Sequence, residues 1–325
     1  MAPTPPSPDL VERFAHDVRA LAPEVEQLAL AVSGGPDSVA LLLLAHAAFP
    51  GRIAAATVDH GLRPEGAAEA RFVADLCAAR DVPHAVLKAE VDRHAASLQQ
   101  SARRARYAAL ADWLERQGVT LLATGHHTDD QAETLLMRLL RGAGAGGLAG
   151  VRARGAFPRF GSKLQLVRPL LGWRRAELSA LVAAAGITPI DDPSNRDPRY
   201  DRTHMRARLA DADWIDPSAL ARSATALAEA DEALNWATLD VYAKRVHEEG
   251  PRLLFAHDAL PREIRRRIVL AILAALEPAA SPRGAELDRL LLMLERGGSA
   301  TLAGIKCVGG AEWIFERAPP RRSGA

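Results

Sequence analysis

The sequence is poor in cysteine and has no long apolar run. Of its 325 residues two are cysteines, Cys77 and Cys307, which lie far apart and form no CxxC pair. This argues against a cysteine-based metal or redox centre and is typical of a reducing compartment. No apolar stretch reaches the roughly 18 residues of a membrane helix, and the start, MAPTPPSPDL, lacks the features of a secretory signal. We therefore expect a cytoplasmic protein with no membrane contact, led by a disordered segment over residues 1–24.

The net charge is also small, only +1, and by itself it indicates no partner. Its distribution is uneven, because residues 151–208 hold 11 Arg and 1 Lys against 5 acidic residues. A local excess of this size is typical of a surface that binds a polyanion. The alternative is a compositional bias, since this chain uses Arg for nearly every cation.

Between residues 25 and 212 short apolar runs alternate with helical patterns. The expected strands are 27–32, 52–59, 84–89 and 119–125, and the expected helices are 37–48, 65–80, 97–117 and 129–141. This alternation predicts an α/β domain, a parallel sheet with helices on both faces. Such sheets bind ligands beyond the carboxyl ends of their strands. The polar clusters SGGPDS, DHGLRPEG and GHHTDD each follow a strand, so they should meet at one rim.

The pattern changes beyond residue 212. A long alanine-rich helix is expected at about 216–245, and it forms a helical linker over residues 213–250. Residues 251–325 mix two helical patterns with short strands such as EWIFER. We expect this last part to fold as a small α+β domain.

Phosphate binding by the first glycine-rich loop is the main functional indication. The chain has no GxxxxGK[ST] loop, and its one GxGxxG string, residues 142–147, follows a helix instead of a strand. SGGPDS, residues 33–38, follows a strand and opens a helix, where backbone N–H groups and the helix dipole favour an anion. Asp37 fits beside phosphates only when a cation such as Mg²⁺ lies between them. An ordinary turn with a helix cap is the alternative.

SGGPDS resembles the PP-loop of the N-type ATP pyrophosphatases, which have a Rossmann-like fold and cleave ATP between the α- and β-phosphates. Four further stretches narrow the resemblance: VDHGLRPEG (58–66), SARRARYAAL (101–110), ATGHHTDDQAETLLMRLLRGAGAGGLAG (123–150) and DDPSNRDPRYDRTHMRARL (191–209). With the loop they resemble the tRNA(Ile)-lysidine synthetase family over about residues 28–210. The resemblance implies that ATP adenylates C2 of the wobble cytidine in a CAU anticodon of tRNA(Ile). The ε-amine of free lysine then displaces AMP and forms lysidine.

Helical spacing places two pairs of charged residues on shared faces. Arg103 and Arg106 are three apart and suited to a phosphate, and the family's phosphate-contacting arginine falls in their motif without selecting one of them. Asp130 and Glu133, also three apart, are suited to ammonium groups. An N-cap role is the alternative for Asp130. A zinc site at GHHTDD is disfavoured because adjacent histidines do not easily share one metal, and His127 is expected to be structural.

The resemblance also implies specific roles for these residues. The expected catalytic residues are Asp37, Arg103, Arg106, His126 and Asp130, with Asp37 as the Mg²⁺ ligand. ATP is expected to contact Ser33, Gly34, Gly35, Pro36, Asp37, Ser38, Asp59 and His60. Lysine is expected at Asp130 and Glu133. The expected tRNA contacts are Arg138, Arg141, Asn195, Arg202 and Arg206, with the C-terminal domain on the tRNA stem.

Three other functions fit parts of the pattern. A PP-loop tRNA thiolation enzyme would normally need catalytic cysteines or CxxC pairs, which are missing. An amidating ligase for a small metabolite would need an ammonia source. A non-catalytic tRNA-binding protein would have no reason to keep Asp37, His126, Asp130 and Glu133 together. Assembly as a homodimer is a further expectation.

Overall fold

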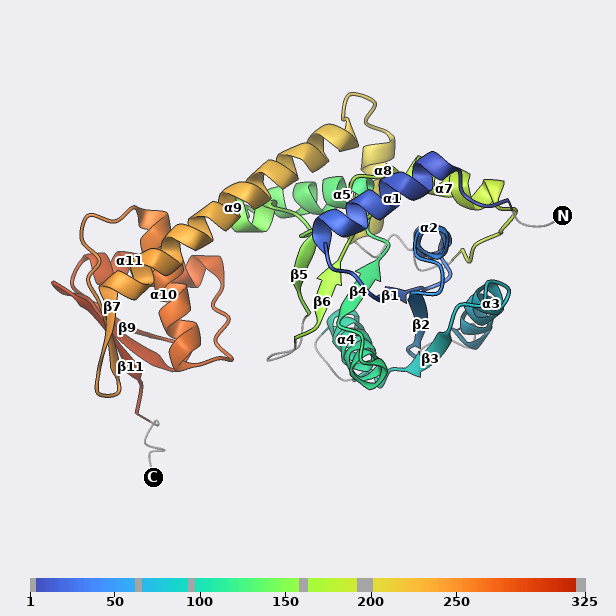
Figure 1. Cartoon of the computed structure of the whole chain (residues 1–325). Coiled ribbons are helices and arrows are strands. Elements are labelled where there is room, and N and C mark those ends of the chain that lie inside the picture. Colours follow the sequence, from blue (N-terminus) through green and yellow to red (C-terminus); the bar gives the residue numbers. More distant parts are fainter. Residues whose placement is uncertain (1–3, 62–65, 93–96, 158–162, 192–200, 320–325) are drawn as a thin grey trace. The chain divides into compact units, whose positions relative to one another are not determined.

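The computed structural model describes residues 4–61, 66–92, 97–157, 163–191 and 201–319 (Figure 1). The chain forms two compact units, Met1–Ala228 and Glu229–Ala325. Their division falls inside one long helix, α9 (Pro217–Arg245), which matches the helix expected at 216–245. The predicted domain limits at residues 212 and 250 stay predictions. In the described part of the chain, the helices are too short or too polar to cross a membrane.

A six-stranded, mostly parallel sheet organises the first unit. Its order is β3-β2-β1-β4-β6-β5, and only the edge strand β5 is antiparallel to its neighbour. The strands agree closely with the prediction, because their apolar runs are short and bounded by polar turns. They are β1 (Leu28–Ala31), β2 (Ile53–Asp59), β3 (His84–Lys88), β4 (Leu121–Thr124), β5 (Arg154–Ala156) and β6 (Gln165–Val167).

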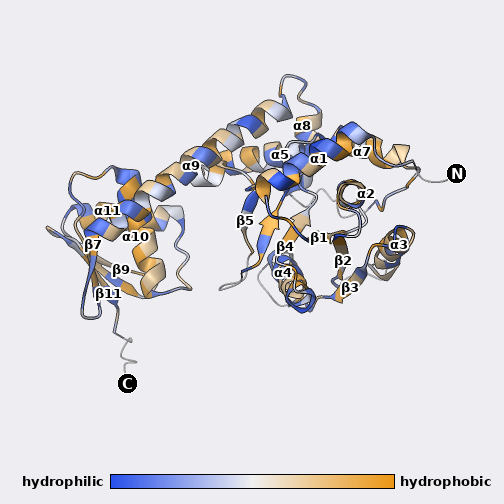
Figure 2. Cartoon of the chain, viewed as in Figure 1, coloured by the Kyte–Doolittle hydropathy of each residue, from blue (hydrophilic) through white to orange (hydrophobic). Residues whose placement is uncertain are grey.

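Helices cover both faces of this sheet, as predicted. Leu28 and Leu30 point to the face that packs on α1, α2 and α7, whereas Ala29 between them points to α4. α2 is apolar on nearly all sides (Figure 2), because residues 39–45 are all buried beneath α1 and α7. The helices are α1 (Pro8–Leu21), α2 (Pro36–Ala48), α3 (Gly66–Ala78), α4 (Leu98–Gln117), α5 (Thr128–Leu139), α6 (Ala145–Leu148), α7 (Arg175–Ala184) and α8 (Asp201–Ala210).

The expected disordered lead over residues 1–24 is wrong for its larger part. Residues 8–21 form α1, which begins with Pro8 at the first helical turn, a position where proline is well tolerated. Phe14 and Val18, four apart, are fully buried in the core of the unit. Asp17 accepts a hydrogen bond from Trp173 Nε1 at 2.8 Å. Apolar burial and this partly buried polar contact together hold the helix in place.

The strand order brings two of the predicted polar clusters together. β1 lies between β2 and β4, so the chain continues to one side of β1 and later returns to its other side. Ligands bind at such a switch point. A Cβ atom on Gly125, just after β4, would lie 2.9 Å from the carbonyl oxygen of Asp37 in the loop after β1. Glycine at this position therefore permits the close approach of the two loops.

The second unit is the predicted α+β domain. An antiparallel sheet of order β7-β8-β11-β10-β9 packs against α10 and α11 around Phe255, Trp313 and Phe315. The elements are β7 (Val246–Glu249), β8 (Arg252–Phe255), α10 (Arg262–Leu276), α11 (Gly284–Glu295), β9 (Ser299–Leu302), β10 (Ile305–Val308) and β11 (Trp313–Arg317).

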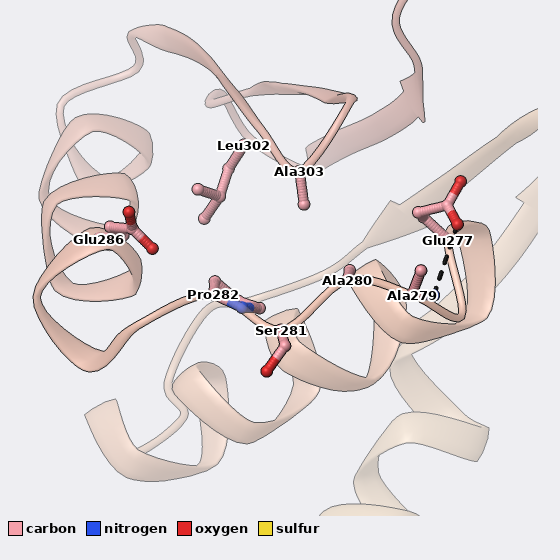
Figure 3. Close-up of a pocket in the computed structure, with 8 residues that line it drawn as sticks. All are labelled: Glu277, Ala279, Ala280, Ser281, Pro282, Glu286, Leu302 and Ala303. Carbon is pink, nitrogen blue, oxygen red and sulfur yellow. Dashed lines mark hydrogen bonds between the residues drawn. The ribbon is translucent and has the colours of Figure 1, made fainter. Parts of the chain in front are cut away.

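A hollow of about 430 Å³ lies in this second unit, and eight residues line it (Figure 3). Two of them are acidic, Glu277 and Glu286. The Glu277 carboxylate accepts a hydrogen bond from the Ala279 N–H at 3.4 Å. None of the predicted site residues lines this hollow.

Candidate active site

The loop after β1 has a backbone that only glycine adopts without strain. Gly34 has φ +87°, and a Cβ atom there would lie 2.3 Å from the Ile190 side chain. The Ile190 N–H donates to the Gly34 carbonyl oxygen at 2.9 Å. Ser38 fixes the loop from inside, accepting from the Ser33 N–H at 3.1 Å and donating to the Gly35 carbonyl oxygen at 2.9 Å. α2 begins at Pro36, so the first turn of a 13-residue helix faces this loop.

Asp37 and His127 meet at the switch point. His127 Nε2 lies 3.5 Å from Asp37 Oδ2 and 3.6 Å from Asp130 Oδ2, and its Nδ1 lies 3.6 Å from Asp129 Oδ2. Burial alone would lower the pKa of His127, but contacts with Asp129 and Asp37 outweigh it and raise that pKa to about 9. His127 is therefore a buried cation among three carboxylates. The expectation of a purely structural His127 overlooked this charge, although the acid-rich sequence after it was a signal.

His126 has the opposite electrostatic state. Its Nδ1 lies 2.9 Å from the Thr124 hydroxyl, and burial, helped by nearby arginines, lowers its pKa to about 4 against the opposing effect of Asp130. Two consecutive histidines at the end of β4 thus divide into a neutral ring and a charged ring.

The two predicted lysine-binding acids lie together and are both buried, Asp130 at 7% and Glu133 at 2% exposure. Arginines of α8 pair with them. Arg202 donates to Glu133 Oε2 and to Asp130 Oδ1, both at 2.8 Å, and Arg206 donates to Glu133 Oε1 at 2.7 Å. Asp130 also accepts the His127 N–H at 3.0 Å. The N-cap residue of α5 is His127 and Asp130 is the third residue of the helix, so the N-cap alternative for Asp130 is wrong, although its carboxylate takes part in the capping.

Arg103 and Arg106 lie on α4, and their positive charges repel each other. Arg103 lies over the ring of Tyr107, with its guanidinium carbon 5.0 Å from the ring centroid. Desolvation lowers the pKa of Arg106, with a smaller contribution from Arg103, although the residue is exposed. His60 is close enough to Arg106 for that cation to lower its pKa further, after burial. Next to His60, Asp59 Oδ1 accepts the Gly61 N–H at 2.9 Å.

The predicted tRNA-binding residues make internal contacts. Arg138 donates to the carbonyl oxygens of Gly147 at 2.7 Å and Gly150 at 3.0 Å, which braces the glycine-rich loop. Arg141 pairs with Asp201 on α8, and Asn195 lies outside the described residues. Gln131, which the sequence did not single out, holds both the N–H and the carbonyl of Val151 through its buried amide.

The loop residues Ser33 to Ser38 and His126, Asp130 and Glu133 thus lie near the ends of β1 and β4, and both α8 arginines join them. Asp37 Oδ1 is buried and has no hydrogen-bond partner within the described chain. An orphaned buried carboxylate oxygen beside a phosphate-binding loop fits a hard cation such as Mg²⁺. Among the described residues, no group of three or more His, Cys, Asp or Glu side chains has the arrangement of a metal site of its own.

The fold and this loop define a PP-loop enzyme, and a family profile described as a PP-loop domain matches residues 9–212. A tRNA(Ile)-lysidine synthase from Novosphingobium aromaticivorans is 49% identical over 96% of this chain and 94% of that protein. One from Zymomonas mobilis is 44% identical over 91% of this chain and 90% of that protein. The chain belongs to the tRNA(Ile)-lysidine synthase family.

A solved structure supports the fold. The U34-tRNA thiolase NcsA from Methanococcus maripaludis, with its [4Fe-4S] cluster, superposes with a TM-score of 0.55 at 16% identity. The match covers 68% of this chain and 79% of that one. Cys77 and Cys307 of this chain are both buried, and burial raises their pKa values to about 11 and about 12. Thiols in this state are poor nucleophiles.

Proposed function

We propose that this chain is an ATP-dependent ligase that attaches free lysine to C2 of the wobble cytidine in the CAU anticodon of tRNA(Ile). The observation that carries the proposal is the meeting of the SGGPDS loop with Asp130 and Glu133 across the β1–β4 switch point. One side of this junction suits a triphosphate and the other suits an amine. The family membership supports the same acceptor.

The first step is adenylation of the cytidine. The C2 carbonyl of cytosine is urea-like and its oxygen is a poor leaving group, so it must first be activated. Backbone N–H groups of Gly34, Gly35, Asp37 and Ser38, at the start of α2, orient the phosphates, and Arg103 or Arg106 neutralises charge that builds on the α-phosphate. Asp37, whose Oδ1 is unpartnered, would hold Mg²⁺. When bound, Mg²⁺ supplies charge neutralisation to the departing pyrophosphate.

The second step is attack by the ε-amine of lysine with loss of AMP. Buried carboxylates bind cationic groups strongly because little water competes. Asp130 and Glu133 already hold two guanidinium groups in the free protein, which supports their capacity for an ammonium group. The attacking amine must lose a proton, and the acceptor is a carboxylate of the site or the neutral ring of His126.

The tRNA is the proposed partner of the basic residues. Arg138, Arg141, Asn195, Arg202 and Arg206 are proposed to lie near the substrate nucleotide, and the C-terminal unit is proposed to hold the stem. Phosphate contacts of this kind weaken with salt, whereas an unstacked anticodon base needs hydrogen bonds and stacking. A cytoplasmic site of action follows from this substrate.

Transfer of labelled lysine tests the proposal. The protein is incubated with ATP, Mg²⁺, labelled lysine and an isoleucine tRNA transcript that carries a CAU anticodon. Label on the tRNA that depends on ATP is the expected result, and the matched transcript with a GAU anticodon should stay unlabelled. Absence of label on the CAU transcript at every salt concentration would contradict the proposal.

A further inference from the structure

Arg168 carries a buried positive charge that no acidic side chain among the described residues neutralises. It directly follows β6 and is 8% exposed. One nitrogen, Nη1, donates to the Arg152 carbonyl oxygen at 2.6 Å, while Nε is buried with no hydrogen-bond partner. Within the described residues it has no acidic neighbour, and burial lowers its pKa. Because buried charges are costly unless they are paired, an unpaired one needs an explanation.

Tyr107 connects Arg168 to Arg103. The Tyr107 side chain is 5% exposed, and its hydroxyl contacts the Arg168 guanidinium. The face of the same ring carries the Arg103 guanidinium, and its edge meets Phe157 at a centroid separation of 5.4 Å. A fixed ring therefore sets the distance between two cations. We call Arg103, Tyr107 and Arg168 the arginine–tyrosine stack.

The acids around the stack are already engaged. Asp130 and Glu133 pair with the two arginines of α8, and Asp129 pairs with Arg174. Arg103 and Arg168 both act on His126, and both disfavour its charged form. The ends of β4 and β6 thus hold a cluster of positive charge that lacks a counter-ion in the described chain. An anion is the ligand that such a cluster takes.

We propose that the arginine–tyrosine stack is a phosphate-binding unit, in which Arg103 contacts the phosphate and Arg168 is a positioning residue that acts through Tyr107. This rests on the proposed function, which supplies two sources of the anion. One is the α-phosphate of ATP, and the other is a backbone phosphate of the tRNA. Both are singly charged phosphate groups, and their non-bridging oxygens are acceptors that suit a planar guanidinium donor.

Arg168 should lower the stability of the free protein and raise its affinity for the phosphate. Removal of its charge relieves the burial penalty when no ligand is present. The same removal weakens the hold on the phosphate, because a cation in a low-dielectric site acts strongly on a nearby anion. A residue that served only packing would show the opposite stability effect, since its loss would destabilise the free protein.

The test compares Arg168→Gln, Arg168→Lys and Tyr107→Phe with an exposed control, Arg71→Gln, in the full chain. The unfolding temperature of each free protein is measured first, and then after addition of Mg–ATP. Binding of tRNA is measured separately as a function of salt. We expect Arg168→Gln to unfold at the same or a higher temperature than wild type and to lose about 10-fold or more in affinity for one ligand. Arg71→Gln should match wild type in every measurement.

The two binding measurements, with Mg–ATP and with tRNA, are the two arms of the test and show which phosphate the stack binds. Loss of the ATP-induced stabilisation assigns the stack to the α-phosphate of the nucleotide. Loss of tRNA affinity, with a salt slope lower by about one, assigns it to a backbone phosphate. Arg168→Lys keeps the charge but not the planar guanidinium group, so its affinity for that ligand should lie between those of wild type and Arg168→Gln. Tyr107→Phe should lose less affinity for the same ligand than Arg168→Gln does.

Unchanged affinity for both ligands in Arg168→Gln overturns the proposal, as does a lower unfolding temperature with intact binding. If Arg168→Gln does not fold, Arg168→Lys and Tyr107→Phe decide the question by the same two arms. Neither arm requires lysidine to form. A wild-type protein that binds ATP and tRNA without transferring lysine would refute the proposed function and still give a result for the stack.

Discussion

Arg206 donates through Nε to Glu133 Oε1 at 2.7 Å, from a helix that lies 73 residues further along the chain. Arg202 holds the other oxygen of the same carboxylate at 2.8 Å. The carboxylate predicted to bind lysine is therefore occupied by cations of the protein itself. Any amine that binds Glu133 has to share it with these arginines or replace one of them.

Glu133→Gln should impair the use of lysine more than the use of ATP. An amide keeps the shape of the side chain but loses the charge-assisted hydrogen bonds, each of roughly 1.5–3 kcal/mol. We expect the KM for lysine to rise about 10- to 100-fold. Pyrophosphate release with tRNA and no lysine should change much less. The exposed control Glu24→Gln should leave both values unchanged, and an equal loss of both steps in Glu133→Gln would contradict the assigned role.

Asp37→Asn should abolish pyrophosphate release. The variant removes the negative charge beside the phosphate-binding loop, and we expect a loss of at least about 100-fold, the usual size for a group that stabilises the transition state electrostatically. The measurement is the initial rate of pyrophosphate release with saturating tRNA and ATP.

Asp129→Asn is the matched control for Asp37→Asn, because Asp129 also contacts His127 but points to the other ring nitrogen. If Asp37 acts on the phosphates, the control should retain most of its rate. Equal losses in the two variants would mean that Asp37 acts only through the charge of His127.

His126 should make the protein less stable below neutral pH. Its pKa is about 4 in the folded chain, below the value of 6.5 that is typical of an unfolded one. Between these values the unfolded state binds a proton that the folded state does not, so the free energy of unfolding falls as pH falls. We expect a loss of roughly 1–2 kcal/mol from this group between pH 7 and pH 5.

His126→Gln, which keeps a partner for the Thr124 hydroxyl, measures that contribution. Urea unfolding of wild type and variant is compared at pH 7 and pH 5. The wild type should lose more stability than the variant across this range. A parallel loss in both proteins would show that His126 ionises normally in the fold.

The first helix should be essential to the stability of the catalytic unit. Phe14 is fully buried against the core, so Phe14→Ala should cost about 3–5 kcal/mol. Glu12→Ala, on the exposed side of the same helix, should stay within about 0.5 kcal/mol of wild type. Chemical unfolding curves give both numbers. A Phe14→Ala variant as stable as wild type would restore the disordered lead that the sequence suggested.

The sequence predicted the sheet well because each strand is a short apolar run closed by a polar turn. The strand expected at 52–59 is Ile53–Asp59, and the helix expected at 97–117 is Leu98–Gln117. α1 was missed since its proline-rich start, MAPTPPSP, obscures the helical spacing of Phe14 and Val18. In that segment tertiary packing decides the structure more than local composition does.

The residue types near the loop could also be predicted from the sequence, but the ion pairs that these residues form could not. Asp130 and Glu133 follow from helical spacing, whereas their contacts with Arg202 and Arg206 join segments about 70 residues apart. The charge of His127 depends on three carboxylates in the first turns of α2 and α5. The lack of an acidic partner for Arg168 among the described residues depends on which acids other residues already hold. Such facts exist only after folding. The assignment of ATP, lysine and tRNA to individual residues stays a prediction.

The central claim is that the tRNA, and not the amino acid, is activated by ATP. ATP labelled at the α-phosphate is mixed with the protein, Mg²⁺ and the CAU transcript without lysine, and the labelled species are separated. We predict that the label accumulates on the tRNA as an adenylate and leaves as AMP when unlabelled lysine is added, with lysidine formed in equal amount. Label found on lysine, with none on the tRNA before lysine is added, would contradict the account.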